Sequence, residues 1–332
     1  MPLDRHARRF LEMLAAAGQT RGRYEDVMER RGALQKLAAL VDPHGHTPTG
    51  GVRDHLMRLA DGNIFMRVYS PLGEPASRLP GMVFFHGGGW VAGSVDTHDG
   101  LCRRLSNETG CRVISVEYRL APEHPFPQGL NDGYAAVAHI MSNAREFGVD
   151  PARLGVAGDS AGATLAAAIC RTARDGGGPR IAFQLLICPI LDVLGEAASR
   201  RELSEGYFLD REMLMRDLEL YCPGAERADP RLSPLCATEY DDLPAAFIHT
   251  AQFDPFADEG EAYAQRLGAA GIAVHGVAHP GMIHLFYCMP RMIPYALDAP
   301  RIIGAELRYA MNLPTLRERR AQRRMRPQPI RS

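Results

Sequence analysis

The stretch Gly158-Asp159-Ser160-Ala161-Gly162 decides the fold, because it places a G-x-S-x-G pattern between two recognisable elements. It follows an apolar, strand-like run at residues 154–157 and precedes a helix-compatible run that extends to residue 174. A sharp turn from strand to helix lifts the serine hydroxyl clear of a sheet, and flanking glycines let backbone segments pass closely. The pattern alone also occurs in glycine-rich turns, but this context makes Ser160 a candidate nucleophile.

Strand-like and helix-like segments alternate on both sides of this turn. The apolar, strand-like runs are residues 81–85, 112–116, 154–157, 183–188, 245–249 and 273–277. The helix-compatible stretches are residues 128–147, 161–174, 258–270 and 294–311. This alternation predicts an α/β fold whose mostly parallel central sheet has helices on both faces. Two further alternating segments, residues 55–60 and 64–69, flank Asp61-Gly62-Asn63 and predict an antiparallel hairpin at one sheet edge.

The first fifty residues and a later insertion depart from this alternation. Apolar periodicity predicts helices around residues 10–17 and 34–41, and residues 42–51 have the composition of a linker. A helix-like stretch at about residues 197–225 stands where the next strand is due. We expect residues 1–50 and this insertion to form a helical cap on a domain of residues 51–314, over the strand ends where open α/β sheets bind ligands.

Composition and hydropathy exclude several classes of protein. The chain has 332 residues, of which 46% are hydrophobic and 23% charged, so collagen-like, fibrous and wholly disordered chains are excluded. It contains no apolar run of about 18 residues, and its N-terminus is charged, unlike a secretory signal. The expectation is a cytoplasmic protein with no membrane insertion.

Charge is unevenly distributed along the chain. The formal net charge is −1, but residues 315–332 hold seven Arg and one Glu, so the remainder is acidic overall. An acidic body argues against nucleic acid as a partner. We expect the basic tail to be a disordered, solvated terminus, with contact to nucleic acid or an anionic membrane as the alternative. Because Lys36 is the single lysine, the chain holds no P-loop or Ser-x-x-Lys nucleophile.

The residues that commonly bind metals or form disulfides are scattered. Seven cysteines include no Cys-x-x-Cys pair, and the histidines form no H-E-x-x-H motif, so we predict neither a disulfide framework nor a metal site. The cysteines are expected to be small core residues or surface thiols. Two carboxylate pairs, Asp241-Asp242 and Asp258-Glu259, are expected in a solvated loop and in the first turn of a helix.

A glycine-rich stretch, His86-Gly87-Gly88-Gly89-Trp90, follows the predicted strand at residues 81–85. Successive glycines expose backbone N–H groups, which an oxyanion hole built from main chain requires. The predicted donors are the amides of Gly87, Gly88 and Ala161, the last being the residue after the candidate nucleophile. A phosphate-binding loop is the alternative, but no G-x-G-x-x-G or Walker lysine accompanies these glycines.

A general base and an orienting acid are expected after the serine, since this type of fold orders its triad Ser, then Asp or Glu, then His. Asp254 follows the predicted strand at residues 245–249, and His284 follows the one at residues 273–277, so both lie on loops at strand ends. The alternatives are a turn residue before a proline for Asp254 and a partly buried histidine for His284. His249 and His279 are less suited, because the first precedes the acid and the second adjoins its strand.

Apolar side chains near these positions are candidates for the wall of a substrate pocket. They are Trp90, Tyr207, Phe208, Phe256, Leu285 and Phe286. Each of them is equally consistent with an ordinary place in the hydrophobic core.

Taken together, these motifs resemble the bacterial hormone-sensitive-lipase family of α/β-hydrolases. The matching stretches, in family order, are residues 86–90, 93–99, 117–127, 158–162, 254–260 and 281–284. The resemblance spans about residues 81–286. It implies the α/β-hydrolase fold with a helical cap, no cofactor, a small-molecule ester as substrate, and often a homodimer through the last edge strand.

The resemblance implies a serine carboxylesterase that hydrolyses short- to medium-chain esters through Ser160, Asp254 and His284 by way of an acyl-enzyme. Many relatives carry Gly where this chain has Leu285, and we expect the leucine to narrow the pocket. Amide, lactone or acetyl-ester substrates would use the same triad and remain alternatives. The plant gibberellin receptors also resemble this family but lack the catalytic histidine, so His284 favours an enzyme over a receptor.

Overall fold

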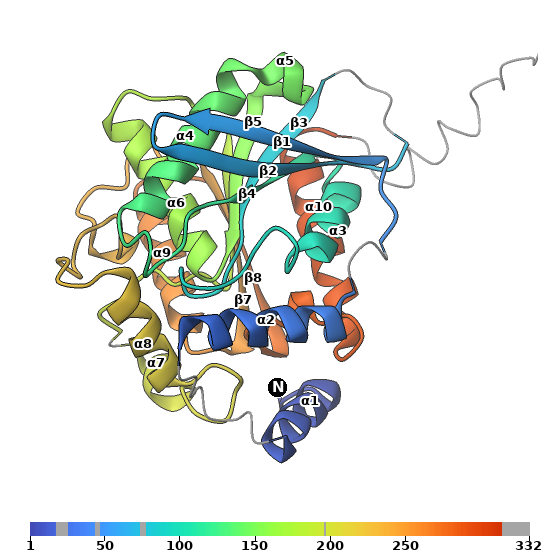
Figure 1. Cartoon of the computed structure of the whole chain (residues 1–332), viewed down its shortest axis with the longest axis vertical. Coiled ribbons are helices and arrows are strands. Elements are labelled where there is room, and N and C mark those ends of the chain that lie inside the picture. Colours follow the sequence, from blue (N-terminus) through green and yellow to red (C-terminus); the bar gives the residue numbers. More distant parts are fainter. Residues whose placement is uncertain (18–25, 44–46, 74–77, 196, 314–332) are drawn as a thin grey trace, which may run out of the picture.

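The computed structural model describes residues 1–17, 26–43, 47–73, 78–195 and 197–313. One eight-stranded sheet forms its centre, in the order β1-β2-β4-β3-β5-β6-β7-β8 (Figure 1). The strands are β1 (Gly51–Leu59), β2 (Gly62–Ser70), β3 (Leu79–Phe85), β4 (Arg112–Glu117), β5 (Val149–Asp159), β6 (Phe183–Ile187), β7 (Ala245–Phe253) and β8 (Val274–Ile283). The six strands from β4 to β8 in this order run parallel, so the predicted α/β fold is confirmed.

The first two strands form the predicted hairpin at one edge of the sheet. They pair antiparallel with Leu59 opposite Gly62 and Met57 opposite Ile64, and β2 in turn pairs antiparallel with β4. Gly62 follows Asp61 in the turn and has φ of 154°, a conformation that residues with side chains rarely adopt. Antiparallel pairing suits this edge, because β1 is largely exposed and needs only one buried face.

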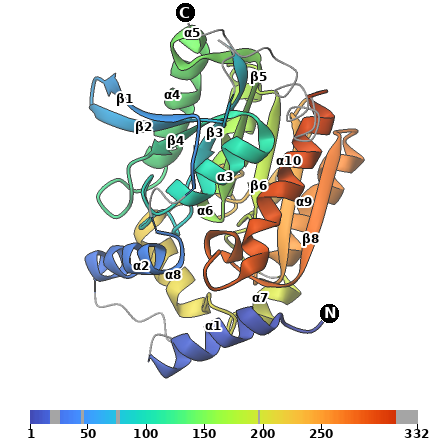
Figure 2. The ribbon, with the colours of Figure 1, turned by 90° about the vertical axis from the view of Figure 1, so that its right-hand side faces the viewer.

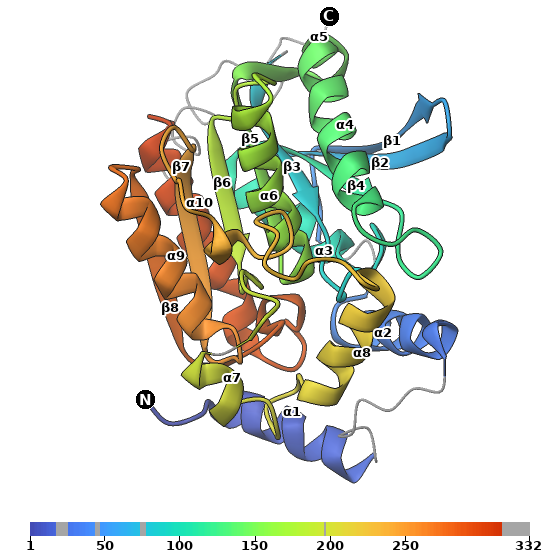
Figure 3. The same cartoon turned by 90° about the vertical axis from the view of Figure 1, so that its left-hand side faces the viewer.

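Helices cover both faces of the sheet. Those of the central body are α3 (Asp99–Thr109), α4 (Gln128–Ser142), α5 (Ala144–Phe147), α6 (Ala161–Asp175), α9 (Ala257–Ala269) and α10 (Ala299–Ala310). Figure 2 shows α3 and α10 side by side on one face, and Figure 3 shows α4, α6 and α9 on the other. Because both faces are covered, strand β3 is buried along its whole length, as its apolar sequence predicts.

The two faces of the sheet have separate hydrophobic cores. Within β3, Val83 and Phe85 belong to the core under α4 and α6, whereas Met82 and Phe84 belong to the core under α3 and α10. This alternation is the period of two expected of a strand. The two cores fix β3 and its neighbours, and therefore fix the loops at their carboxyl ends.

Three details differ from the sequence-based expectation. Helix α3 was not expected; it ends at Gly110, whose φ of 75° is the left-handed conformation that suits a helix C-terminus. The single helix predicted for residues 128–147 is two helices, separated at Asn143. The helix predicted for residues 294–311 begins as a 3₁₀ turn at Pro294–Leu297 before α10.

Four more helices lie together at the carboxyl ends of the parallel strands (Figures 2 and 3). They are α1 (Arg5–Ala16), α2 (Val27–Val41), α7 (Ala198–Glu202) and α8 (Arg211–Tyr221). The first two begin earlier than predicted, and each begins after an aspartate, Asp4 or Asp26, whose side chain accepts hydrogen bonds from backbone N–H groups of the first turn. Residues 197–225 form two short helices, and the basic tail at residues 315–332 lies outside the described residues.

Candidate active site

Ser160 occupies the turn between β5 and α6. Its φ of 52° and ψ of −120° are unusual for a residue with a side chain, and its amide donates a hydrogen bond to the carbonyl of Ile187 on the neighbouring strand. A β-carbon at Gly158 would collide with the carbonyl oxygen of Gly162, and one at Gly162 would collide with that of Phe85. The two glycines are therefore required by close backbone contacts, as the motif predicts.

Asp254 and His284 meet Ser160 at the same edge of the sheet. Asp254 follows β7 and His284 follows β8, and both side chains are buried. Nε2 of His284 lies 3.0 Å from Oγ of Ser160, and Nδ1 lies 2.8 Å from Oδ2 of Asp254. The three residues, widely separated in sequence, thus form one continuous hydrogen-bonded chain. His249 and His279, the other histidines considered, instead pair with each other in the core, 3.2 Å apart.

The carboxylate of Asp254 determines which nitrogen of His284 carries the proton. A carboxylate can only accept, so Nδ1–H of His284 donates to Asp254 and leaves Nε2 to accept the hydroxyl proton of Ser160. The backbone N–H of Phe256 donates to the other oxygen of Asp254 at 2.9 Å. The ring of Phe256 meets the imidazole edge to face, at 5.3 Å between centroids. These contacts hold the imidazole in the orientation that a general base for Ser160 requires.

Cys188, directly after β6, also lies beside the hydrogen-bonded residues Asp254 and His284. Its thiol and the nearest side-chain atoms of Asp254 and His284 lie within 4.8 Å of one another, a spacing compatible with a metal ion. However, both ring nitrogens of His284 already have hydrogen-bond partners. Burial, together with the adjacent Asp254 carboxylate, raises the pKa of Cys188 well above its usual value, so this thiol is held protonated.

The glycine-rich loop after β3 lies beside Ser160, but Gly87 has a different place from the one expected. Its amide already donates to Oδ1 of Asp159 at 2.9 Å, and a β-carbon on it would collide with that carboxylate. Gly88 and Gly89 both line the pocket, with φ of 126° and 65°. Within the described part of the chain no hydrogen-bond acceptor is found for either of their amides. The amide of Gly87 is thus already occupied by Asp159, whereas those of Gly88 and Gly89 are not occupied by any described residue.

Asp159 is the buried carboxylate that holds this loop. Besides the Gly87 amide, it interacts with Nε2 of His98 at 3.3 Å and accepts a hydrogen bond from the hydroxyl of Tyr287 at 3.2 Å. Burial alone would raise its pKa, but the charge and hydrogen bond of His98 and the Gly87 amide outweigh burial and lower it. Asp159 is therefore held ionised directly next to Ser160. The sequence motif contains this residue, but its role depends on loops that only the fold brings together.

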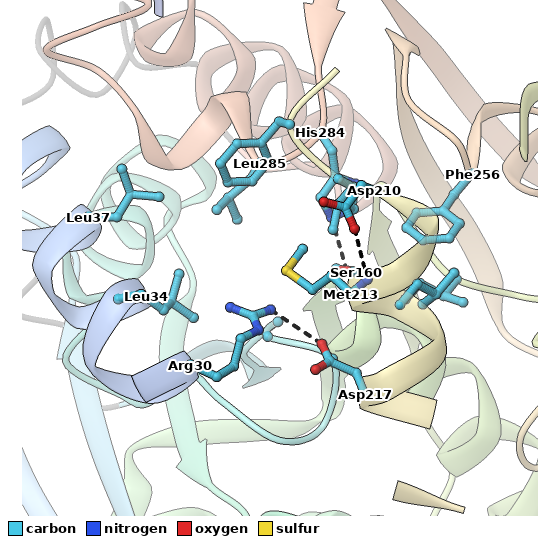
Figure 4. A pocket seen from close by; sticks show the side chains of 18 of the residues that line it. Arg30, Leu34, Leu37, Ser160, Asp210, Met213, Asp217, Phe256, His284 and Leu285 are labelled. Atoms are coloured by element: carbon cyan, nitrogen blue, oxygen red, sulfur yellow. Dashed lines mark hydrogen bonds and ion pairs between the residues drawn. The ribbon is translucent and has the colours of Figure 1, made fainter. Parts of the chain in front are cut away.

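A pocket of about 350 Å³ opens above Ser160 and His284 (Figure 4). Phe208, Phe256 and Leu285 line it, as expected, together with Leu34 and Leu37 from α2. The remaining lining residues are Leu14, Glu29, Arg30, Ala33, Gly87, Gly88, Gly89, His98, Ile190, Leu209, Asp210, Met213, Leu214 and Asp217. The wall is therefore shared between the strand-end loops and the helices α1, α2 and α8.

Three of the aromatic residues expected in the pocket lie elsewhere. Trp90 is buried against Tyr221, with parallel rings 4.6 Å apart. Tyr207 stacks on Phe253, and Phe286 is buried in the core beneath α10. Aromatic composition does not distinguish a pocket wall from a core, so these three could not be separated from Phe208 and Phe256 by residue type.

Sequence reasoning also missed the charged part of the wall. Arg30 on α2 and Asp217 on α8 form an ion pair of 3.3 Å inside the pocket (Figure 4). Arg30 lies before the helix predicted at residues 34–41, Asp217 lies in the helix-like insertion at residues 197–225, and 187 positions separate them. No local signal connects two such residues.

None of the helices in the described ranges is both long and apolar enough to cross a membrane.

Comparisons with known proteins show the family to which this chain belongs. A family model described as "alpha/beta hydrolase fold" matches residues 82–288. The carboxylesterase NlhH of Mycobacterium tuberculosis is 40% identical over 243 residues, which cover 71% of this chain and 75% of NlhH. An arylesterase of Saccharolobus solfataricus is 35% identical over 303 residues, covering 88% of this chain and 94% of the arylesterase.

A solved structure is similar over nearly the whole chain. The ester hydrolase EH1AB1 from the metagenome of Lake Arreo, in complex with a bipyridine phosphonate derivative, has a TM-score of 0.88 and 42% identity, covering 93% of this chain and 99% of that one. The expected resemblance is thus confirmed by both sequence and structure. This chain belongs to the α/β-hydrolase fold family, in its hormone-sensitive-lipase-like branch.

Proposed function

We propose that this chain is a serine carboxylesterase that hydrolyses short- to medium-chain carboxylic esters through Ser160, His284 and Asp254. Its relatives are carboxylic ester hydrolases, and this class of enzyme applies to the present chain as well. The observation that supports the finer proposal is the hydrogen-bonded chain from Ser160 through His284 to Asp254, at 3.0 Å and 2.8 Å, at the base of an apolar pocket.

In the proposed reaction Oγ of Ser160 attacks the ester carbonyl carbon while Nε2 of His284 accepts its proton. The C–O bond to the alcohol then breaks, and His284 gives the proton to the departing oxygen, leaving an acyl-enzyme. A water molecule, deprotonated by His284, attacks the acyl carbonyl, and the proton returns to Ser160 as the acid departs. Asp254 remains ionised throughout and stabilises the imidazolium formed in each half.

The negative charge that develops on the carbonyl oxygen needs hydrogen-bond donors. We assign this role to the amides of Gly88, Gly89 and Ala161. Ala161 is the first residue of α6, so its N–H has no partner within the helix and lies at the positive end of the helix dipole. Gly87, predicted as a donor, instead orients the loop through its bond to Asp159.

The size of the pocket supports small acyl groups. A volume of about 350 Å³ lies near the lower end of the roughly 300–1,000 Å³ found for small-molecule sites. Leu285 narrows the pocket next to His284 and has φ of 64°, a conformation that strongly favours glycine. Both features favour acetyl to hexanoyl esters over long-chain lipids.

The test is the acyl-chain dependence of kcat/KM with p-nitrophenyl esters, for the wild type and Ser160→Ala. We expect a maximum at short chains, and a fall in kcat of at least about 10³-fold in the variant. Wild-type turnover that survives in Ser160→Ala would contradict the assignment. No turnover of any ester, with turnover of amides or lactones, would move the proposal to those substrates.

Two further expectations belong to this proposal. A homodimer through the edge strand β8 would leave the pocket open, since the site lies at the carboxyl ends of the strands. Light scattering during size-exclusion chromatography measures this directly: twice the mass of 36.5 kDa is expected, and a monomer at all concentrations would contradict it. A cytoplasmic location is likewise proposed and would be checked by cell fractionation.

A further inference from the structure

The pocket contains a buried ion pair that the proposed mechanism does not use. The guanidinium of Arg30, on α2, lies 3.3 Å from Oδ2 of Asp217, on α8, and both line the pocket that opens above Ser160. Their side chains are only 12% and 4% exposed. An ion pair this well shielded from water is not a solvated surface contact, so the charge of each partner influences the pocket strongly.

Asp217 touches the loop that we assign to the oxyanion. A β-carbon added to Gly89 would collide with Oδ2, Cγ and Cβ of Asp217, so this side chain packs directly against the Gly89 backbone. Figure 4 shows the side chains of Arg30 and Asp217 pointing toward each other, below Ser160 in this view. The carboxylate of Asp217 therefore lies against Gly89, whose amide we assign to the stabilisation of negative charge on the carbonyl oxygen.

A carboxylate in this position opposes the proposed reaction unless its charge is balanced. The transition state places negative charge on the carbonyl oxygen, and a second negative charge nearby raises the energy of that state more than that of the neutral substrate. A cation paired with the carboxylate cancels much of this effect. Arg30 is such a cation, and it comes from a different part of the chain than the loop that it affects.

We propose that Arg30 is a positioning residue for ester hydrolysis: it balances the charge of Asp217 and holds that carboxylate against Gly89. The N-terminal helix α2 thereby contributes to turnover as well as to the pocket wall. This inference rests on the proposed function, because it needs an oxyanion next to Gly88 and Gly89. It adds a residue that acts through Asp217 and touches neither Ser160 nor His284.

The test is a double-mutant cycle with Arg30→Met, Asp217→Asn and the double variant, measured with p-nitrophenyl acetate. Methionine keeps most of the length of arginine without its charge, and asparagine keeps the shape of aspartate without its charge. We expect Arg30→Met to lower kcat about tenfold or more, with KM changed by less than about threefold. In the Asp217→Asn background the same substitution should change kcat by less than about threefold, because no carboxylate remains to be balanced.

Three controls separate this role from a structural one. Titration of active sites with a phosphonate inhibitor corrects kcat for any unfolded fraction. Arg30→Lys retains the charge and should keep most of the wild-type kcat. Arg211→Met removes an exposed arginine from α8 that does not line the pocket, and it should leave kcat unchanged.

The outcomes that would overturn the proposal are distinct from those that would overturn the function. If the wild type hydrolyses the ester and Ser160→Ala does not, the proposed function stands. Equal kcat for Arg30→Met and the wild type would then refute the inference alone. A loss of kcat that persists undiminished in the Asp217→Asn background would also refute it, because charge balance would not be its cause.

Discussion

The catalytic loops and the capping helices of this molecule are held in place in different ways. Ser160, Asp254 and His284 each follow a strand of the central sheet, and backbone hydrogen bonds and two apolar cores fix these strands. The capping helices contribute no strand to the sheet and attach through side chains alone. Apolar ones, such as Phe10 of α1 and Leu218 of α8, join the two cores, and charged ones add ion pairs. Arg31 of α2 pairs with Glu123 at 2.6 Å, and Arg200 of α7 pairs with the buried Glu259 at 2.6 Å.

This difference matches the division of work that we propose. The reacting groups must keep their geometry within a few tenths of an ångström, which a packed sheet provides. The wall of the pocket must differ among substrates, and a layer attached by individual side chains can change without disturbing the sheet. Substitutions at strand ends should therefore affect the reaction itself, whereas substitutions in or facing the cap should change which esters react, with the pair of Arg30 and Asp217 as the exception.

The largest effect on kcat is expected among the residues at the strand ends, from Asp254→Asn. An amide can present an N–H to Nδ1 of His284, which favours the wrong tautomer and leaves the imidazolium without a countercharge. We expect kcat for p-nitrophenyl acetate to fall about 10⁴-fold, with circular dichroism and the thermal midpoint little changed. A loss smaller than about tenfold in the folded variant would show that Asp254 does not orient the base.

The next effect tests the assignment of the oxyanion loop, by comparing Gly89→Ala with Gly177→Ala. Both glycines have similar positive φ, 65° and 59°, but a methyl group at Gly89 would collide with Asp217, whereas that at Gly177 meets no atom within 4 Å. The two variants thus carry similar backbone strain, but only Gly89→Ala displaces neighbouring atoms. We expect kcat to fall about 10²- to 10³-fold in Gly89→Ala only.

Two other results of this comparison would contradict the assignment. An equal and small loss of kcat in both variants would mean that the position of the Gly89 amide does not matter. A large loss in Gly177→Ala would mean that backbone strain far from the site is responsible. Active-site titration distinguishes either case from simple unfolding.

The residues at the strand ends were easier to predict from sequence than those of the capping helices. The turn at Ser160 and the loop at Gly88 were predictable because their chemistry is encoded locally, by glycines at fixed spacing between a strand and a helix. Asp254 and His284 were predictable because parallel strands deliver their following residues to one edge. The fold was predictable for the related reason that apolar strands alternate with helices.

What could not be predicted depends on contacts between distant segments. Gly87 carries the same local signal as Gly88 and Gly89, and only the approach of Asp159 shows that its amide is already occupied. Trp90 and Phe286 are aromatic like the true pocket residues, but their neighbours in space place them in the core. Helix α3 was missed because it holds few apolar residues: its buried face includes Asp99, Arg104 and Ser106 beside Leu101 and Leu105.

A smaller effect is expected where the cap and the body share the pocket wall, from Leu285→Gly. The substitution removes the side chain that narrows the pocket and relieves a positive φ of 64°. We expect the ratio of kcat/KM for hexanoate to that for acetate to rise about tenfold, because added methylene groups gain apolar contact. Leu297→Gly, at an exposed position outside the pocket, is the control and should leave the ratio unchanged.

An unchanged acyl profile in Leu285→Gly would contradict the view that this wall sets substrate size. A loss of activity toward all esters alike would instead indicate that Leu285 positions His284, its neighbour in the chain.

The smallest effect concerns the stability of the body and its dependence on pH. Burial, and secondarily the adjacent His249, lower the pKa of His279 to about 3, whereas an unfolded histidine has a pKa of about 6.5. Below about pH 6.5 the unfolded chain therefore takes up a proton that the folded chain does not, and stability is lost as pH falls. The neighbouring polar groups are His249, Tyr295 and, on the far side of His249, Glu306.

Replacing His279 by glutamine removes the site at which the unfolded chain takes up this proton. Between about pH 6 and pH 4 we expect the free energy of unfolding of His279→Gln to fall less steeply than that of the wild type, by about 1.4 kcal/mol per pH unit. Urea unfolding at several pH values measures the slope. The exposed His124→Gln is the control, and an equal slope in His279→Gln and the wild type would contradict the prediction.

The central claim is that Ser160 is the nucleophile of this site, and covalent labelling tests it most directly. The protein is treated with a p-nitrophenyl phosphonate ester, a reagent that captures an activated serine, and peptides are analysed by mass spectrometry. We predict one equivalent of released p-nitrophenol, a phosphonate on the peptide that contains Ser160, complete loss of esterase activity, and no labelling of Ser160→Ala. Labelling of another residue with parallel loss of activity, or full activity after Ser160 is modified, would contradict the account.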